Sequence, residues 1–155
     1  MTPAGGLHGI PHPTARFIVT AGGFFTIVGS SEASMTKHIL VVEDQEDNRQ
    51  IMRDLLTAND YEMTEAENGE EALAAVAKDR PDLILMDIQL PVMDGCEATR
   101  RIKADPSLSS IPIIAVTSYS LSGDEEKARA AGCNDFVPKP FSPRQLLAKI
   151  RQYLP

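Results

Sequence analysis

Five short apolar runs alternate with helical patterns from Lys37 to the end of the chain. The runs are continuously apolar and rich in Val, Ile and Leu, which is typical of strands buried on both faces of a sheet. They span residues 38–42, 61–66, 82–86, 111–116 and 135–137, and 61–66 is the most weakly apolar of them. Because such strands interleaved with helices form a parallel sheet with helices on both sides, the pattern predicts a doubly wound α/β fold of the (βα)5 type.

The helical segments carry apolar stripes and local start signals. Asn68 with Glu71 and Ser142 with Gln145 have capping-box spacing, and Pro143 suits a first helical turn. The side chains expected to face inward are, helix by helix, Ile51, Met52, Leu55 and Leu56; Ala72, Leu73, Val76 and Ala77; Ala98 and Ile102; and Leu146, Leu147, Ile150, Tyr153 and Leu154. These signals place a helix after each strand.

Residues 1–36 differ from the rest of the chain, because they are rich in Gly, Pro, Ser and Thr and carry only two charged side chains. The apolar piece Phe17–Gly29 is shorter than the roughly 20 residues that a membrane-spanning helix needs. With Arg16 ahead of it, this piece weakly resembles a secretory signal. The favoured interpretation is that Met35 is the natural start and that the residues before it come from an over-extended start. We expect residues 1–36 to be poorly ordered and unnecessary for function, and 37–155 to form one domain.

Composition excludes some classes of function. A chain of 155 residues with 43% hydrophobic content supports one domain with a substantial core. Its net charge of −7 argues against a nucleic-acid binder and provides no basic patch for an anionic membrane. Cys96 and Cys133 form no CxxC pair and no metal-ligand spacing with the histidines, which indicates reduced thiols in a reducing compartment. We therefore expect a cytoplasmic protein.

Polar side chains gather where the predicted strands end. Four of the five strands deliver acids, a hydroxyl or a lysine: Glu43 and Asp44, Asp87, Thr117, and Lys139. The second strand ends in Glu65-Ala66-Glu67 and offers no evident partner. Any one of these side chains alone is most simply a solvated loop residue. In a parallel sheet, however, all carboxyl ends lie at one edge, where functional residues collect, so the set is expected to form one site.

The chemistry that suits this set is phosphoryl transfer. Clustered carboxylates raise one another's pKa unless a cation neutralises them, and oxygen ligands with room for water suit Mg²⁺. A lysine and a hydroxyl facing the ion would hold phosphoryl oxygens, while one carboxylate acts as the nucleophile. Asp87 is the best candidate for the nucleophile, because the most apolar strand holds it at the centre of the site.

The segments "VVEDQ", "LILMDIQLPVMDG", "IPIIAVTS" and "DFVPKPF" together resemble the receiver domain of two-component response regulators. The likeness runs from about Lys37 to the C-terminus. It implies a flavodoxin-like fold with strand order 2-1-3-4-5. It also implies that Asp87 is the phosphoacceptor and that Mg²⁺ is held by Glu43, Asp44, Asp87 and the backbone carbonyl of Gln89. Thr117 would bind the phosphoryl oxygens, Lys139 would pair with them, and the Lys139-Pro140 bond would be cis.

The resemblance further implies a switch. Thr117 would move toward a phosphoryl group on Asp87, and Phe136 would turn inward into the space behind it; the simpler alternative is that Phe136 is a core aromatic. Segment 122–132, whose apolar face is poor, would shift with this change. The 121–155 face would then bind a downstream protein.

A few positions depart from the common pattern or vary within it. The first acid is Glu43 where many members have Asp, and a longer carboxylate can still reach a metal through a water. Gln89 and Tyr119 occupy the two variable positions that flank the site and are expected to tune hydrolysis of the acyl phosphate. Asn48 resembles the residue found in receivers of hybrid kinases and of DivK-like regulators, and is otherwise only a helix N-terminal residue.

The favoured function is a stand-alone response regulator that takes a phosphoryl group from a sensor histidine kinase or a histidine phosphotransfer protein. Such a protein catalyses only its own phosphorylation and dephosphorylation, and binds neither nucleic acid nor membrane. The alternatives are a receiver module detached from a hybrid kinase, an unphosphorylated scaffold, and a haloacid-dehalogenase-like phosphatase. The phosphatase needs a second Asp two residues after the nucleophile, where this chain has Gln89.

Overall fold

The computed structural model describes residues 16–19, 25–28, 36–118 and 123–155. The chain divides into two compact units, Met1–Thr36 and Lys37–Pro155. In the first unit, β1 (Arg16–Val19) pairs with β2 (Phe25–Val28) in an antiparallel hairpin that the sequence pattern does not predict. Most of this unit lies outside the described residues, so its expected disorder stays a prediction.

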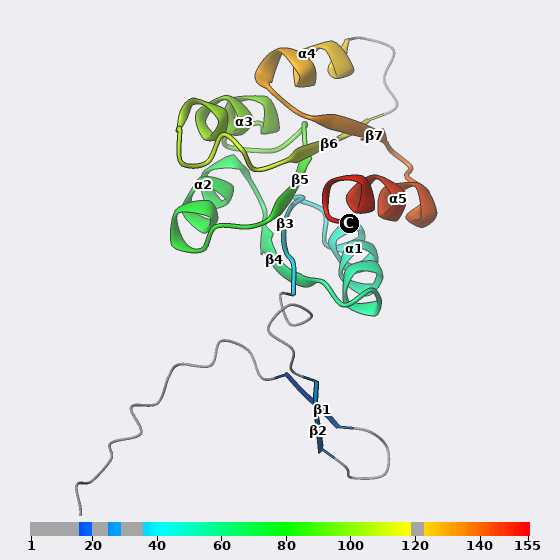
Figure 1. Ribbon diagram of the computed structural model, residues 1–155. Coiled ribbons are helices and arrows are strands. Elements are labelled where there is room, and N and C mark those ends of the chain that lie inside the picture. The colour runs from blue at the N-terminus through cyan, green and yellow to red at the C-terminus, as the bar shows by residue number, and fades with distance from the viewer. Residues whose placement is uncertain (1–15, 20–24, 29–35, 119–122) are drawn as a thin grey trace, which may run out of the picture. The chain divides into compact units, whose positions relative to one another are not determined.

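The second unit is built on a five-stranded parallel sheet, as predicted (Figure 1). Its strands are β3 (His38–Val42), β4 (Glu62–Ala66), β5 (Leu83–Asp87), β6 (Ile113–Thr117) and β7 (Asp135–Pro138). Their order in the sheet, β4-β3-β5-β6-β7, is the expected 2-1-3-4-5 order. The central strand β5 is buried along its whole length, as expected from the continuous apolar run of residues 83–86.

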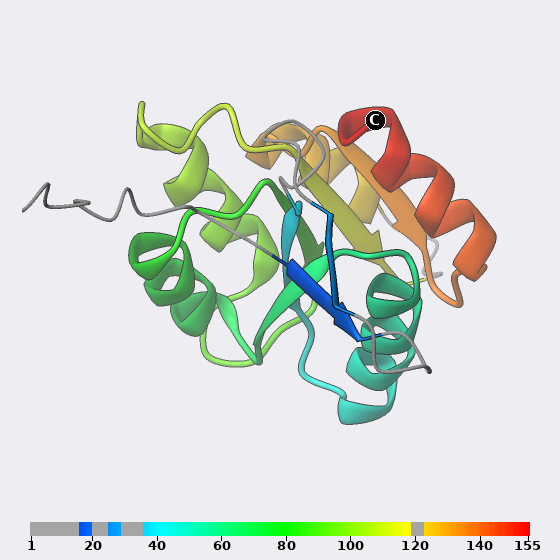
Figure 2. The same cartoon turned by 60° about the horizontal axis from the view of Figure 1, so that its bottom comes forward.

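Five helices cover the two faces of this sheet: α1 (Glu46–Ala58), α2 (Gly69–Lys78), α3 (Gly95–Ala104), α4 (Asp124–Ala131) and α5 (Pro143–Tyr153). Alternate strand residues point to opposite faces. Val41 and Leu85 therefore pack with α1 and α5, whereas Val42 and Met86 pack with α2 and α3. In Figure 2, α2 and α3 lie on one side of the strands and α1 and α5 on the other. Among the described residues, no helix is both long and apolar enough to cross a bilayer.

Local signals at the helix ends are confirmed in part. The Asn68 side chain accepts a hydrogen bond from the Glu71 N–H at 2.9 Å, and Gly132 caps the C-terminal end of α4 with a φ of 107°, which suits glycine. Ser142 precedes α5 and Pro143 begins it, as expected. The capping box proposed for Ser142 is wrong, however, because within the described residues its side chain makes no capping hydrogen bond.

The inward stripe of α1 is rotated from the expected one. The residues of α1 that are buried are Arg49, Met52 and Leu56, which follow one another at helical spacing. Leu55 is partly buried against the same cluster, but Ile51 is 47% exposed, so its predicted inward position is wrong. Helix α1 meets the sheet along the Arg49 side of the expected stripe, and this rotation leaves Ile51 at its edge.

Candidate functional site

The five predicted strand-end residues come together at one edge of the sheet. Asp87 is the last residue of β5 and Thr117 the last of β6, while Glu43 and Asp44 follow β3 and Lys139 follows β7. Because the strands are parallel, these positions lie side by side although the chain separates them by up to 96 residues.

Asp87 is held rigidly at the end of the central strand. Its carboxylate is 3% exposed, and its Oδ2 accepts a hydrogen bond from Lys139 Nζ at 2.7 Å. Its Oδ1 accepts a second one from the Gln89 N–H at 3.1 Å. Helix α3 begins against the same strand end: a Cβ atom at Gly95 would stand 2.0 Å from the main-chain oxygen of Asp87. Glycine at this position therefore lets the first residue of α3 pack directly against the main chain of Asp87.

Glu43 is completely buried beside Asp87 and has polar partners on both carboxylate oxygens. Oε2 accepts a hydrogen bond from Lys139 Nζ at 2.8 Å, and Oε1 accepts one from Asn48 Nδ2 at 2.8 Å. Lys139 thus bridges the two buried carboxylates, which partly offsets the cost of burying them. Asn48 thus contacts the site through Glu43, in addition to lying in the first turn of α1.

The buried carboxyl pair holds a proton more tightly than isolated acids would. Burial and the neighbouring Glu43 raise the pKa of Asp87 to about 7, against the opposing effect of Lys139. For Glu43, burial acts to raise the pKa, but hydrogen bonds with Asp87, Lys139 and Asn48 outweigh it and lower that pKa. The proton is therefore held on Asp87, and a cation that displaced it would leave Asp87 ionised.

Three carboxylates of the site are arranged as a metal could use them. One oxygen from each of Glu43, Asp44 and Asp87 lies within 4.8 Å of the others. Hard oxygen donors on a partly open edge suit Mg²⁺, and a cation there would offset the burial and the neighbouring Glu43 that raise the pKa of Asp87. These residues fit the ion that the resemblance implies.

The two residues expected to switch lie on β6 and β7. Thr117 is 2% exposed, and its main-chain oxygen accepts a hydrogen bond from the Lys139 N–H at 2.6 Å. Phe136 is half-buried, with the Arg129 guanidinium carbon 4.9 Å from its ring centroid. The flanking Tyr119 and the first two residues of the 121–155 face lie outside the described residues.

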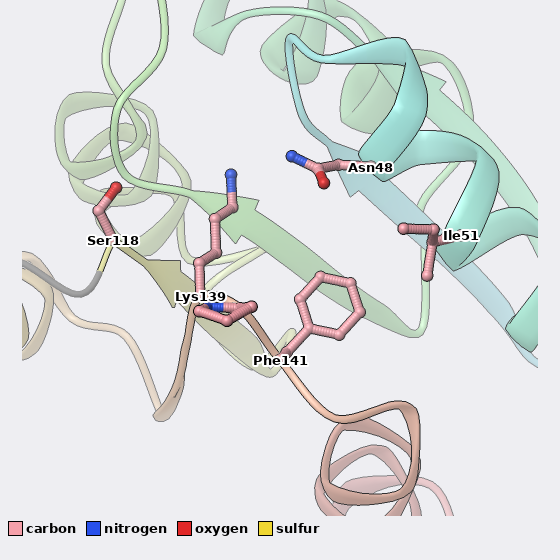
Figure 3. A pocket seen from close by; sticks show the side chains of 6 residues that line it. Asn48, Ile51, Ser118, Lys139 and Phe141 are labelled. Atoms are coloured by element: carbon pink, nitrogen blue, oxygen red, sulfur yellow. The ribbon is translucent and has the colours of Figure 1, made fainter.

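A hollow of about 340 Å³ opens beside Lys139. It is lined mainly by apolar surface from Asn48, Ile51, Ser118, Lys139, Pro140 and Phe141. Figure 3 shows Asn48 and Ile51 approaching it from α1, with Lys139 and Phe141 on the segment that leads into α5. The Lys139-Pro140 peptide bond is cis, as the resemblance implies. The exposed Ile51 thus borders the site.

One charged residue near the site escaped the sequence interpretation. Arg49 is 7% exposed, and its Nη1 donates a hydrogen bond to the main-chain oxygen of Glu43 at 2.7 Å. It also contacts Glu65 and Glu67, the strand-end acids that had no evident partner. The spacing of Arg49 could have predicted its burial, because it lies three residues before Met52, on the buried stripe of α1.

Comparisons with known proteins agree with this geometry. The family model for the response regulator receiver domain matches residues 39–151. The chain is 46% identical over 120 residues to the polar-differentiation response regulator DivK of Brucella anthropi, covering 77% of this chain and 98% of that protein. That protein is matched over nearly its whole length and is itself a regulator, so the alternative of a receiver module detached from a hybrid kinase is not favoured.

Solved structures give the same result. The receiver domain of the sensor histidine kinase PA1611 from Pseudomonas aeruginosa, with magnesium coordinated in its active-site cleft, is 37% identical with a TM-score of 0.72; the match covers 76% of this chain and 97% of that one. The receiver domain of Ssk1, crystallised with the histidine phosphotransfer protein Ypd1 of Saccharomyces cerevisiae, is 32% identical with a TM-score of 0.70; that match covers 76% and 88%. The chain belongs to the family of response regulator receiver domains.

Proposed function

We propose that Asp87 accepts a phosphoryl group from a phosphohistidine and that the phosphorylated form signals by binding another protein. The observation that carries this proposal is the position of Asp87. It is a buried carboxylate at the end of the central strand, 2.7 Å from the Lys139 ammonium and clustered with Glu43 and Asp44. Lys139 supplies positive charge and the strand end aligns the nucleophile, which together with a cation is most of what phosphoryl transfer asks of a protein.

Mg²⁺ is the proposed cofactor, held by the carboxylates of Glu43, Asp44 and Asp87 and by the backbone carbonyl of Gln89. When bound, the ion supplies positive charge to the three carboxylates and to the phosphoryl oxygens. Three carboxylates and one lysine leave a formal charge of −2 at the site, which a divalent cation balances. The magnesium described in the PA1611 receiver supports this assignment.

In the transfer step, an ionised Asp87 oxygen attacks the phosphorus atom. A P–O bond forms while the P–N bond breaks, and its electron pair returns to the imidazole of the donor. Lys139 exchanges its hydrogen bond to Asp87 for one to a phosphoryl oxygen, and the Thr117 hydroxyl donates to another. Removal of the proton from Asp87 is therefore a precondition of the reaction.

The donor is a sensor histidine kinase or a histidine phosphotransfer protein, as in the Ssk1–Ypd1 complex. The hollow beside Lys139, with Ile51 and Phe141 on its walls, offers an apolar surface next to the reacting carboxylate. The signal then passes through Thr117 and Phe136 to the 121–155 face, where a downstream protein binds. The protein acts in the cytoplasm, has no separate substrate to turn over, and contacts neither nucleic acid nor membrane.

The direct test is intact-mass spectrometry after incubation with acetyl phosphate and Mg²⁺. The wild type should gain one labile phosphoryl group, and Asp87→Asn and EDTA-treated protein should gain none. Beryllofluoride, which mimics the phosphoryl group, should bind the wild type alone. Absence of any adduct under all these conditions would leave the unphosphorylated scaffold as the function.

A further inference from the structure

Arg49 is the one lysine or arginine among the described residues that is less than a tenth exposed. A buried guanidinium is costly unless its donors are satisfied, and its contacts show what it holds in place. Its Nη1 donates to the main-chain oxygen of Glu43 at 2.7 Å. Its other nitrogens meet the carboxylates of Glu46, Glu65 and Glu67.

The carbonyl that Arg49 holds belongs to the peptide bond between Glu43 and Asp44. The Glu43 N–H is already fixed by the main-chain oxygen of Ala66 at 3.0 Å, in the last step of the β3–β4 ladder. This N–H belongs to the preceding Val42–Glu43 peptide plane, so with the carbonyl also held both planes that flank Glu43 are fixed, including the Glu43–Asp44 plane. Since that plane joins the two acidic residues, its orientation sets the direction in which both carboxylates leave the main chain.

Arg49 also connects the site to the neighbouring strand. Glu65 and Glu67 flank the end of β4, and the same guanidinium contacts Glu65 Oε1 at 3.4 Å and Glu67 Oε1 at 3.2 Å. Helix α1, the turn after β3 and the end of β4 are thereby tied to one planar group. The planar guanidinium can donate to several acceptors at once in a fixed geometry, which a lysine ammonium cannot do.

We propose that Arg49 is a positioning residue for the acidic corner of the site, acting through the Glu43 carbonyl to aim Glu43 and Asp44 at the cation. This inference rests on the proposed function, because it assigns a task to Arg49 in binding Mg²⁺. The alternative role is a stabilising ion-pair cluster with no effect on the site.

Arg53 provides a matched control one turn further along α1. It pairs with Glu46 and Glu65, two of the three carboxylates that Arg49 contacts. Within the described part of the chain, no bond joins Arg53 to Glu43. The variants Arg49→Met and Arg53→Met therefore both weaken the ion-pair cluster, but only Arg49→Met releases the carbonyl.

The experiment is a Mg²⁺ titration of the full-length ¹⁵N-labelled protein, followed by its amide resonances, for the wild type, R49M, R49K and R53M. We expect R49M to raise the Kd for Mg²⁺ roughly 10-fold, as the loss of an outer partner of a metal ligand typically does. R53M should change it less than about twofold, because exposed ion pairs contribute little. The Kd of R49K should lie between those of the wild type and R49M, because lysine keeps the positive charge but lacks the planar set of guanidinium donors.

A second readout separates positioning from general damage. The rate of phosphorylation by acetyl phosphate should fall in R49M at low Mg²⁺ and recover toward the wild-type rate at saturating Mg²⁺. Equal Kd values for R49M and R53M, or a wild-type Kd in R49K if R49M does not fold, would overturn the inference. A wild type that takes up neither Mg²⁺ nor phosphoryl would overturn the proposed function instead.

Discussion

Replacing Asp87 by Asn should stabilise the protein at alkaline pH while abolishing phosphorylation. The side chain is 3% exposed, and burial beside Glu43 raises its pKa from 3.8 to about 7. The folded state therefore binds this proton more tightly than the unfolded chain does. The contribution of Asp87 to the free energy of unfolding is therefore greatest below about pH 4, where the side chain is protonated in both states. It is lost as the pH rises to about 7.

The size of the effect follows from the same shift. A difference of about 3 pKa units corresponds to about 4 kcal/mol as an upper limit. The lowered pKa of Glu43, which shares the proton and Lys139 with Asp87, offsets part of it. We expect Asp87→Asn to gain about 2 kcal/mol at pH 8, or roughly 6–10 °C in Tm for a domain of this size. At pH 5 the gain should be about a third as large.

Thermal unfolding followed by circular dichroism between pH 5 and pH 8, with EDTA present, measures this difference. Asp47→Asn, which removes an exposed carboxylate from the first turn of α1, is the matched control for the loss of one negative charge. Added Mg²⁺ should stabilise the wild type and leave Asp87→Asn unchanged. A variant no more stable than the wild type at pH 8, or a gain independent of pH, would refute the reasoning.

Three further perturbations test the fold and the site. Gly95→Ala places a Cβ 2.0 Å from the main-chain oxygen of Asp87, so urea unfolding should show a loss of about 3 kcal/mol; a loss below ~1 kcal/mol would mean that α3 can move away. The Kd for Mg²⁺, measured by calorimetry, should fall about tenfold per pH unit up to the pKa of Asp87, about 7, and then level off, because the proton must leave before the ion binds; a flat profile would contradict this. Deleting residues 1–34 should change Tm by less than ~2 °C and leave phosphorylation by acetyl phosphate intact, whereas loss of folding would show that the segment is needed.

The arrangement of the sheet could be predicted from sequence because its determinants are local. A strand buried on both faces must be continuously apolar, as residues 83–86 are, and a polar residue such as Asp87 marks where it ends. Parallel strands place all such ends at one edge. The clustering of the five predicted site residues could therefore be predicted from the sequence without any measured distance. Their chemical roles are tested by the experiments above.

The rotation of α1 and the hydrogen-bond partners in the site depended on the tertiary structure. Ile51 belongs to the predicted stripe and Arg49 lies beside it, and only the fit of the helix on the sheet decides that Arg49 is buried and Ile51 exposed. Likewise, Lys139 lies 52 residues from Asp87 and 96 from Glu43. Periodicity reports the contacts of a segment with its own helix or strand. It carries no information about which distant side chain shares a proton or holds a carbonyl, because packing of the whole chain sets those contacts.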